Sequence, residues 1–408
     1  MAKTENLLKR IAELEAATGV KRTLFAVCPN SAAVIRAAFR ASKRNNAPIY
    51  FAATLNQVDG DGGYTDMTQA EFTKILAQEA AAVNFTGDYI VAIDHGGPWL
   101  KDIQTSEKWD TEKAMNGVKK SFEDALLAGY DLIHVDPTVD IFVPKGEIID
   151  IKVVAKRTVD LIEHTERFRR ERNLPEVSYE VGTEEVHGGL ADEATFDLFI
   201  SELKAGLKAA GLAEVWPIFI VGKVGTDLHT TTFDPVVARQ LTAKVRPLGS
   251  YIKGHYSDGV TNPEEYPLSG MGGANVGPEF TMSEYDALAE LEEVEKGLYA
   301  KGEVARLSKM TKVLTDLVVR SNRWQKWLQA DEKGLAFEAL QPERRTWITK
   351  TCCRYIWQQP EAMVARAQLY DNLTRVGMCP EEVVLMRIER DMDNYFRAFN
   401  LVNLNNIL

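Results

Sequence analysis

The sequence predicts an α/β fold: a (β/α)8 TIM barrel followed by a C-terminal helical appendage. Eight short runs of β-branched, aromatic and other apolar residues alternate with amphipathic stretches, and most of the runs are apolar almost without interruption. Such runs are typical of strands buried on both faces of a parallel sheet, and eight of them alternating with helices favour a closed barrel. The runs are residues 23–28, 48–54, 88–94, 131–136, 177–182, 216–222, 250–254 and 271–277.

The stretches between the runs have the start signals of helices. Asn30 is expected to cap the helix that follows the first run. Thr68 with Glu71 matches the capping box, in which a hydroxyl and a carboxylate each satisfy a backbone amide of the first turn. Thr281 with Glu284 matches it as well. The main helical patterns cover residues 1–19, 31–43, 111–127, 151–172, 194–210 and 235–245.

One interval is too short and too broken for a full helix. Only about 15 residues separate His255 from the eighth run, and glycines and prolines interrupt them, which predicts a loop. Beyond the eighth run the chain continues as helices. We therefore expect a barrel domain over residues 1–301 and a helical extension over residues 302–408, which packs on the barrel or forms an oligomer surface.

Composition narrows the class of protein. With 45% hydrophobic and 26% charged residues, the chain is typical of a globular protein. Its net charge of −11 and the lack of basic clusters argue against a nucleic-acid partner. Residues 1–19 resemble an amphipathic helix rather than a signal peptide, and no apolar stretch is long enough for a membrane span. The four cysteines form neither a zinc nor a disulfide pattern, so we expect a cytoplasmic location.

The residues that suggest chemistry follow the strand-like runs. In a barrel of this kind, the loops after the strands form the active-site face, so residues distant in sequence converge there. Imidazole and carboxylate groups suit a divalent metal, with Zn²⁺ the first choice and Mn²⁺ or Co²⁺ as alternatives. Four metal-ligand candidates lie at the ends of the third, fifth, sixth and seventh runs: His95, Glu184, His229 and His255.

The other three histidines have plainer interpretations. His134 lies inside an apolar run and is expected to be a hydrogen-bonded residue of the core or rim. His164 is expected to be an ordinary helix residue. His187 is a weaker loop candidate for a ligand.

Two aspartates end strand-like runs and are candidate catalytic groups. Asp94, beside His95, suits general acid/base work, because a carboxylate in such a pocket can have a tuned pKa. The alternative role is to orient a neighbouring histidine. For Asp136 the two roles are equally supported by the residues alone.

Substrate contacts are expected from the same ends of the strands. The amides of Asn56 and Gln57 fit hydroxyl recognition, and the glycines around the eighth run would let backbone approach a phosphate. Lys223 is either a cation that binds an anionic group or, in a rival chemistry, a Schiff-base lysine. The candidates are Asn56, Gln57, Lys223, Asp258, Gly272, Gly273 and Asn275.

Several motifs together resemble one family. On these motifs the chain is similar, nearly end to end, to the so-called non-catalytic subunit of class II tagatose-bisphosphate aldolase, a family also labelled tagatose-6-phosphate kinase. Kinase activity finds no support, because the sequence has no Walker-type loop. The motifs are Asn56-Gln57-Val58, Gly62-Gly63-Tyr64-Thr65, Met67-Thr68, Asp94-His95, Gly97-Pro98, Ile133-His134-Val135-Asp136, Gly182-Thr183-Glu184, Val276-Gly277-Pro278 and Arg354-Tyr355-Ile356-Trp357.

The resemblance implies roles for these residues. That family is similar to the zinc-dependent class II fructose-bisphosphate aldolases, and some relatives are ketohexose-phosphate 4-epimerases. The Asp-His pair of the aldolases matches Asp94 as acid/base and His95 as metal ligand. The remaining metal-proximal positions match Glu184, His229 and His255.

The resemblance implies retro-aldol cleavage of the C3–C4 bond of a ketohexose or its phosphate, by a 4-epimerase or an aldolase. The alternative is an accessory subunit that stabilises a separate class II aldolase catalytic subunit. We also expect a homo-oligomer. The chain departs from the family at Asp136-Pro137-Thr138, where Asp-Ala-Ser is usual, and at Lys223, where proline is usual. No Gly-Gly-Ser phosphate loop is evident around His255, so the phosphates of the substrate stay open.

Overall fold

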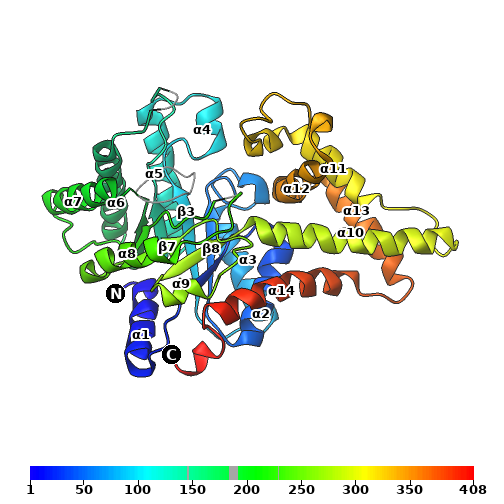
Figure 1. The fold of residues 1–408 in the computed structure, drawn as a ribbon, viewed down its shortest axis with the longest axis horizontal. Coiled ribbons are helices and arrows are strands. Elements are labelled where there is room, and N and C mark those ends of the chain that lie inside the picture. The colour runs from blue at the N-terminus through cyan, green and yellow to red at the C-terminus, as the bar shows by residue number, and fades with distance from the viewer. Residues whose placement is uncertain (145–146, 183–191, 228) are drawn as a thin grey trace.

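The chain folds around a closed barrel of eight parallel strands, seen in a computed structural model that describes residues 1–144, 147–182, 192–227 and 229–408 (Figure 1). The strands are β1 (Leu24–Val27), β2 (Ile49–Thr54), β3 (Tyr89–Gly96), β4 (Leu132–Val135), β5 (Ser178–Val181), β6 (Phe219–Val221), β7 (Tyr251–Gly254) and β8 (Gly273–Val276). They pair in sequence order, and β8 closes the barrel against β1. All eight predicted strands and the fold class are confirmed.

Helices surround the barrel, as the alternation of patterns predicted. They are α1 (Lys3–Thr18), α2 (Ala32–Asn45), α3 (Gln69–Ala82), α4 (Asp102–Ser106), α5 (Thr111–Leu127), α6 (Ile151–Glu171), α7 (Glu193–Ala209), α8 (Pro235–Val245) and α9 (Glu265–Leu268). The capping box of Thr68 and Glu71 is present at the start of α3. Between His255 and β8 the described helix is the four-residue α9, in line with the loop expected there.

Two predicted helix starts are wrong. Ser31, rather than Asn30, caps α2. The side chain of Asn30 instead donates a hydrogen bond to the carbonyl oxygen of Gly277, just before the helix that follows β8. That helix is α10 (Pro278–Ala300), which begins at a proline. Proline suits the first helical position because it lacks the N–H that would be unpaired there. Thr281 and Glu284 therefore lie inside α10 and form no capping box.

The C-terminal extension leaves the barrel and returns to it. Helix α10 runs outward from β8, the next three helices pack along it, and the last helix runs back beneath it toward α2 (Figure 1). These four helices are α11 (Met310–Ser321), α12 (Pro342–Cys352), α13 (Pro360–Thr374) and α14 (Pro380–Ala398). Three 3-10 turns lie between them, η3 (Arg323–Trp327), η4 (Phe337–Ala339) and η5 (Cys353–Tyr355).

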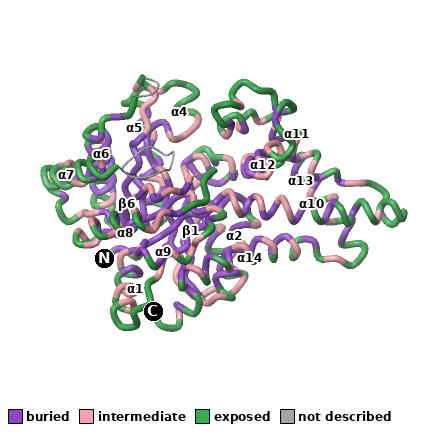
Figure 2. Tube along the Cα trace, viewed as in Figure 1, coloured by how far each residue is buried: buried purple, intermediate pink, exposed green. Residues whose placement is uncertain are grey.

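Helix α14 attaches the extension firmly to the barrel. Glu389 is buried and pairs with Arg40 at 2.6 Å and with Arg44, both from α2. The ring of Phe396 lies 5.2 Å from that of Phe25 in β1. One cluster of buried apolar residues includes side chains of both parts, and Figure 2 shows buried residues continuing from the strands into the extension. The boundary between residues 301 and 302 stays a prediction.

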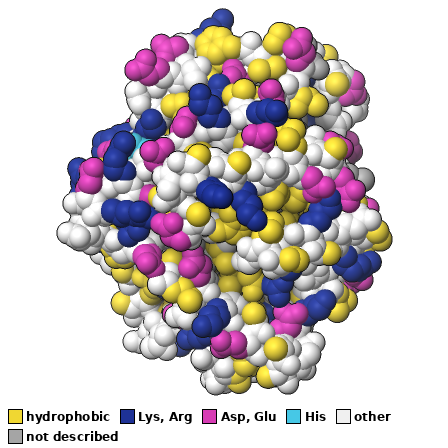
Figure 3. Space-filling view, turned by 90° about the vertical axis from the view of Figure 1, so that its left-hand side faces the viewer, with side chains coloured by type: hydrophobic (Ala, Val, Ile, Leu, Met, Phe, Trp, Pro, Cys, Tyr) yellow, Lys and Arg dark blue, Asp and Glu magenta, His cyan; other side chains and the backbone are white. Residues whose placement is uncertain are grey.

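The surface agrees with the charge pattern of the sequence. On the face shown in Figure 3, Lys and Arg side chains are interspersed with Asp and Glu among the described residues, without a broad field of one sign. In the described part of the chain, no helix combines the length and apolar character that crossing a membrane requires.

Candidate metal centre and active site

An irregularity in β3 presents two neighbouring side chains to one cavity. Side chains of a regular strand alternate between its two faces, yet Asp94 and His95 both line the same cavity. The register of β3 against β4 shifts between Ile93 and Gly96, and His95 has a φ of 48°. Bulges re-aim side chains in this way, and a positive φ at a non-glycine residue persists only where its surroundings hold it.

Four side chains converge at the carboxyl end of the barrel. Nε2 of His95 lies 2.8 Å from Nδ1 of His255. Oδ1 of Asp94 lies 4.0 Å from that Nε2 and 3.8 Å from that Nδ1. His134 completes the group, in which one ligand atom from each residue lies within 4.8 Å of the others. The structure thus brings together three residues that the sequence singled out and adds a fourth.

Carboxylates behind the two imidazoles determine which ring nitrogens face each other. Nδ1 of His95 contacts Oδ2 of Asp136 at 2.6 Å, and Nε2 of His255 contacts Oε1 of Glu180 at 2.8 Å. Because an ionised carboxylate only accepts hydrogen bonds, each of these nitrogens carries the N–H of a neutral ring. The opposite nitrogens, which face each other, then both present lone pairs. That arrangement is stable only with a proton or a metal ion between them.

The pKa values of the two histidines agree with one shared positive charge. Burial disfavours a charged His95, but Asp94 and the hydrogen bond to Asp136 overcome this and raise its pKa to about 9. Burial lowers the pKa of His255 to about 4, despite the opposing effect of Asp94. Burial also disfavours an ionised Asp94, but the charges of His95 and His255 hold its pKa well below the usual value. Asp94 is therefore an ionised carboxylate in the fold.

The local charge favours a divalent cation. Glu180 is fully buried and its Oε2 pairs with Nζ of the equally buried Lys253 at 2.6 Å. With neutral histidines, Asp94, Asp136 and Glu180 outweigh this single ammonium by two negative charges. Buried charge without compensation is costly, so an ion of charge +2 fits the site. Imidazole nitrogens with a carboxylate oxygen are a donor set for zinc, with manganese or cobalt as alternatives.

His134 is a buried core residue, as predicted, but it also supports the cluster. Its Nδ1 accepts a hydrogen bond from the backbone N–H of His95 at 2.9 Å. An imidazole nitrogen has one lone pair, so this bond occupies Nδ1 and steadies the strained backbone of His95. Within the described structure its buried Nε2 has no hydrogen-bond partner.

Asp136 lies behind His95 and not at the cavity surface. Its Oδ2 holds His95, and its Oδ1 accepts a hydrogen bond from the hydroxyl of Thr138 at 2.6 Å. It is absent from the described residues that line the cavity. Of the two roles left open by the sequence, this position supports the orienting one, since a carboxylate hydrogen-bonded to a ligand histidine fixes its tautomer.

Asn275 and Asp258, both predicted to bind substrate, line the cavity but differ in what they can offer. Asn275 donates to Oδ1 of Asp94 at 3.0 Å, while its own buried Oδ1 has no partner in the described structure. Asp258 instead accepts hydrogen bonds from the amides of Gly277 and Glu279 at 2.9 and 2.8 Å. It holds the start of α10.

Asn56 and Gln57 also line the cavity, but their amides are used within the protein. Asn56 accepts a hydrogen bond from the amide of Asp102 at 2.9 Å and donates to the same loop. Gln57 accepts from the amide of Thr54 at 2.8 Å and donates to Asn30 at 3.0 Å. The contacts of Asn56 join the loop after β2 to the segment after β3, and those of Gln57 join it to the segment after β1. Hydroxyl recognition by these two residues stays a prediction.

Gly272 and Gly273 do not lie at the cavity, which corrects their assignment as substrate-binding residues. They stand at the amino end of β8, whereas the cavity opens at the carboxyl ends of the strands. A Cβ on Gly272 would lie 2.4 Å from Cβ of Tyr251, and one on Gly273 would lie 3.4 Å from Lys253. The small size of Gly272 therefore serves packing against Tyr251, whereas a Cβ at Gly273 would make only an ordinary contact.

The other predicted residues lie apart from the cluster or outside the described residues. His229 is exposed, and its ring packs against Trp347 of α12 with centroids 5.2 Å apart, so the structure does not bring it to the cluster. Lys223 is not among the described residues that line the cavity. His164 pairs with Glu123 at 2.8 Å as an ordinary helix residue. Glu184 and His187 lie outside the described residues.

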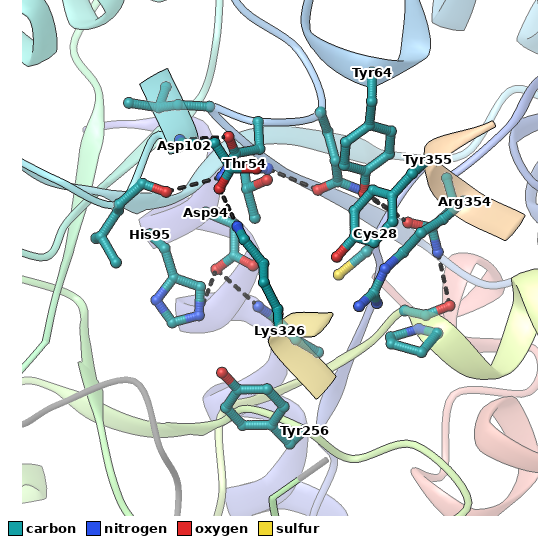
Figure 4. Close-up of a pocket in the computed structure, with 18 of the residues that line it drawn as sticks. Cys28, Thr54, Tyr64, Asp94, His95, Asp102, Tyr256, Lys326, Arg354 and Tyr355 are labelled. Carbon is teal, nitrogen blue, oxygen red and sulfur yellow. Dashed lines mark hydrogen bonds and ion pairs between the residues drawn. The ribbon is translucent and has the colours of Figure 1, made fainter. Parts of the chain in front are cut away.

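The cavity above the cluster has a volume of 380 Å³, within the range of small-molecule sites. Figure 4 shows Asp94 and His95 on one side of it and side chains of the extension on the other. The extension therefore forms one wall of the site. Its contributions are Arg323, Lys326, Trp327, Arg354 and Tyr355.

Sequence reasoning missed Glu180, Lys253 and this wall. A signal existed for the first two, because each places one charge inside an otherwise apolar strand, and buried charges need partners. Arg354 belongs to a motif that was noticed without a role. Nothing in the sequence placed that motif against the mouth of the barrel.

Comparisons with known proteins agree with this architecture. A family model described as "D-tagatose-1,6-bisphosphate aldolase subunit GatZ/KbaZ-like" matches residues 8–395. A probable tagatose 6 phosphate kinase from Sinorhizobium meliloti 1021 superposes with a TM-score of 0.75 at 22% identity, covering 92% of this chain and 100% of that one. Fructose-bisphosphate aldolase from Campylobacter jejuni has a TM-score of 0.57 at 11% identity, with 98% and 95% covered. A putative fructose-1,6-biphosphate aldolase from Coccidioides immitis has a TM-score of 0.50 at 11% identity, with 100% and 99% covered.

Proposed function

The chain belongs to the D-tagatose-1,6-bisphosphate aldolase subunit GatZ/KbaZ-like family, and from this premise we propose that it is a metal-dependent enzyme that cleaves the C3–C4 bond of a ketohexose or its phosphate. Its overall reaction is 4-epimerisation when the fragments stay bound and aldol cleavage when they leave. The observation that carries the proposal is the pair of facing nitrogens of His95 and His255, 2.8 Å apart beside Asp94.

His95 and His255 would hold the divalent ion, with Asp94 beside it. Such an ion supplies Lewis-acid polarisation of the ketose carbonyl, which makes C3 a better acceptor of electrons. The buried carboxylates Asp136 and Glu180 keep both imidazoles in the tautomer that binding requires. The sequence also predicted His229 and Glu184 as ligands, and the cluster found among the described residues does not contain them.

Asp94 is the group that moves the proton. Its carboxylate takes the proton of the C4 hydroxyl, the C3–C4 bond breaks, its electron pair stays on C3, and C4 becomes an aldehyde carbon. In the epimerase, the aldehyde turns, C3 attacks its other face, and Asp94 returns the proton to the oxygen on C4. Oδ1 of Asn275, which has no hydrogen-bond partner in the described structure, would accept a substrate hydroxyl at this end of the cavity.

The test uses the purified chain alone. It is incubated with fructose, tagatose, their 6-phosphates and their bisphosphates, with and without a chelator, and the products are followed by NMR. Interconversion at C4 that stops with chelator and restarts with Zn²⁺ is the expected result for the epimerase, and release of triose is expected for the aldolase. Absence of any turnover by metal-loaded protein across the panel would contradict an enzyme of this class for these sugars.

The family description favours a second candidate, an accessory subunit of a class II aldolase. The word "subunit" in that description is the observation behind it. This role requires a stable complex with a catalytic aldolase chain, formed through the extension, and little turnover by the isolated chain. Co-expression with a class II aldolase, followed by size-exclusion chromatography with light scattering, tests the complex. The same measurement on the isolated chain tests the proposed homo-oligomer.

A further inference from the structure

The wall of the cavity contributed by the extension holds a buried cation that forms no ion pair among the described residues. Arg354 in η5 is only 7% exposed, and it lines the cavity. In the described part of the chain, no carboxylate forms an ion pair with it, and its buried Nε has no hydrogen-bond partner. In Figure 4 its side chain extends from the extension toward the barrel side of the cavity.

Two aromatic rings fix the position of this guanidinium. Its central carbon lies 4.7 Å from the centroid of Trp327 and 4.9 Å from that of Tyr355. Contacts of this kind stabilise a cation by about 0.5–2 kcal/mol, but they add no negative charge. Removing a charge from water without a partner costs more than this. Asp258 interacts with this cation through its charge but forms no ion pair with it in the described structure, so Arg354 can stabilise a further anion.

Neighbouring charges add to the positive character of this wall. Arg323 and Lys326 of η3 share a single carboxylate, that of Asp102, which Arg323 contacts at 2.5 Å. Asp258 also lines the cavity, but its Oδ1 is engaged by the backbone amides at the start of α10. Three cations thus face two carboxylates at this wall, whereas the metal cluster carries an excess of two negative charges.

We propose that Arg354, assisted by Lys326, binds the anionic group of the substrate, a phosphate or a carboxylate on the carbon chain remote from the metal cluster. The substrate is then an anionic ketose, with its carbonyl end at the cluster and its anionic end at the extension. This inference rests on the proposed function for the identity of the ketose. The guanidinium fork matches both oxyanions, since it presents parallel N–H donors.

In this proposal the extension takes part in the reaction by binding the anionic end of the substrate. The anion-binding wall lies within residues 323–355, whereas the metal cluster comes from residues 94–255, and α14 holds the extension on the barrel. An anionic end bound at Arg354 keeps a substrate, or both of its fragments, oriented above Asp94. A neutral ketose lacks this anchor and is expected to bind more weakly.

The experiment measures binding apart from turnover. Inorganic phosphate, and separately fructose 6-phosphate and fructose, are titrated calorimetrically into the full-length, zinc-loaded chain and into Arg354→Met. Charge-assisted hydrogen bonds lost with the guanidinium predict about 10- to 100-fold weaker binding of both phosphates and unchanged binding of fructose. Arg375→Met is the matched control, because Arg375 is an exposed arginine paired with Asp371 on the surface.

Two further variants, Lys326→Met and Arg354→Lys, test the proposal even if Arg354→Met does not fold. Lys326 is 48% exposed, so Lys326→Met is expected to fold even if the variant of Arg354 does not, and to weaken phosphate binding several-fold. Arg354→Lys, which keeps the charge and loses the fork, is expected to lie between Arg354→Met and the native chain. If Arg354→Met and Lys326→Met both bind phosphate as the native chain does, the proposal is overturned.

Two further comparisons identify the anion and distinguish a failure of this proposal from a failure of the proposed function. Binding of a ketose with a carboxylate at C6, without binding of phosphate, would assign the wall to a carboxylate; binding of neither anion would overturn the proposal. His95→Ala is expected to retain phosphate binding, because Arg354 lies on the other wall. Phosphate binding at Arg354 in a chain without turnover would refute the proposed function alone.

Discussion

Nδ1 of His95 lies 2.6 Å from Oδ2 of Asp136, and this contact directs the opposite nitrogen of the ring at His255. The two residues end neighbouring strands of the barrel, so the contact depends on the bulge in β3 and on the register of β4. A ligand histidine oriented in this way is already in the tautomer that a metal ion needs.

Asp136→Asn is expected to weaken metal binding. The amide can present its N–H to Nδ1 and thereby move the ring proton to the nitrogen that faces His255. Losses of about 10- to 100-fold in metal affinity are typical when such a carboxylate is removed. Competition with a chromogenic zinc chelator measures the change. An affinity equal to that of the native chain would remove Asp136 from the support of the metal site.

Asp94→Asn is expected to separate metal binding from turnover. The amide retains an oxygen beside the histidines but cannot accept the C4 proton. The rate of ketose conversion should fall by about 10²- to 10⁴-fold, the usual contribution of a general base, with metal content maintained. Single-turnover NMR with the metal content measured on the same sample checks both. A normal rate would show that another group moves the proton.

Lys253→Met is expected to destabilise the fold. It leaves Glu180 buried without its partner, and breaking a buried pair from one side costs about 3–5 kcal/mol. The double variant Lys253→Met, Glu180→Gln should recover much of the loss, because it removes both charges. Urea unfolding followed by circular dichroism measures the free energies. Equal stability of the single variant and the native chain would contradict the pairing.

Glu279 is expected to make the stability depend on pH. Burial and the charge of Asp258 raise the pKa of its carboxyl to about 7, against hydrogen bonds from Tyr395 and the amide of Gly259. The native state then keeps a proton that the unfolded chain releases at its lower pKa, so the unfolding free energy falls as pH rises from about 5 to 7. Glu279→Gln removes this pH dependence. Relative to the variant, the free energy of unfolding of the native chain should fall by about 1–3 kcal/mol over that range.

Urea unfolding of both proteins at matched pH values tests this dependence. A difference between the two curves that stays constant from pH 5 to pH 8 would mean that Glu279 ionises normally in the fold.

The barrel was predictable because its strands repeat one strong signal. Each is a short run buried on both faces, and burial leaves that pattern in the sequence. Helix starts were less secure. Thr281 and Glu284 have the spacing of a capping box, yet a proline three residues earlier starts α10. Local patterns compete, and the sequence does not show which one the tertiary packing selects.

The site was predictable where it depends on strand ends. Asp94, His95 and His255 meet because parallel strands of a barrel end on one rim. Gly272 and Gly273 were misplaced because a glycine pattern does not tell a phosphate loop from close packing inside a barrel. Arg354 and Lys326 reach the cavity through the path of the extension, which no local pattern encodes. Their contribution needed the three-dimensional structure.

The most direct test of the metal centre is its zinc content. Four proteins are compared: the native chain, His95→Ala, His255→Ala and the control His164→Ala, whose histidine in α6 pairs with Glu123 of α5. Each is dialysed against zinc and then against metal-free buffer, and bound zinc is measured by plasma mass spectrometry. We expect one zinc ion per chain in the native protein and in the control, and its loss in His95→Ala and His255→Ala. A native chain without zinc, or full zinc content in His95→Ala, would contradict it.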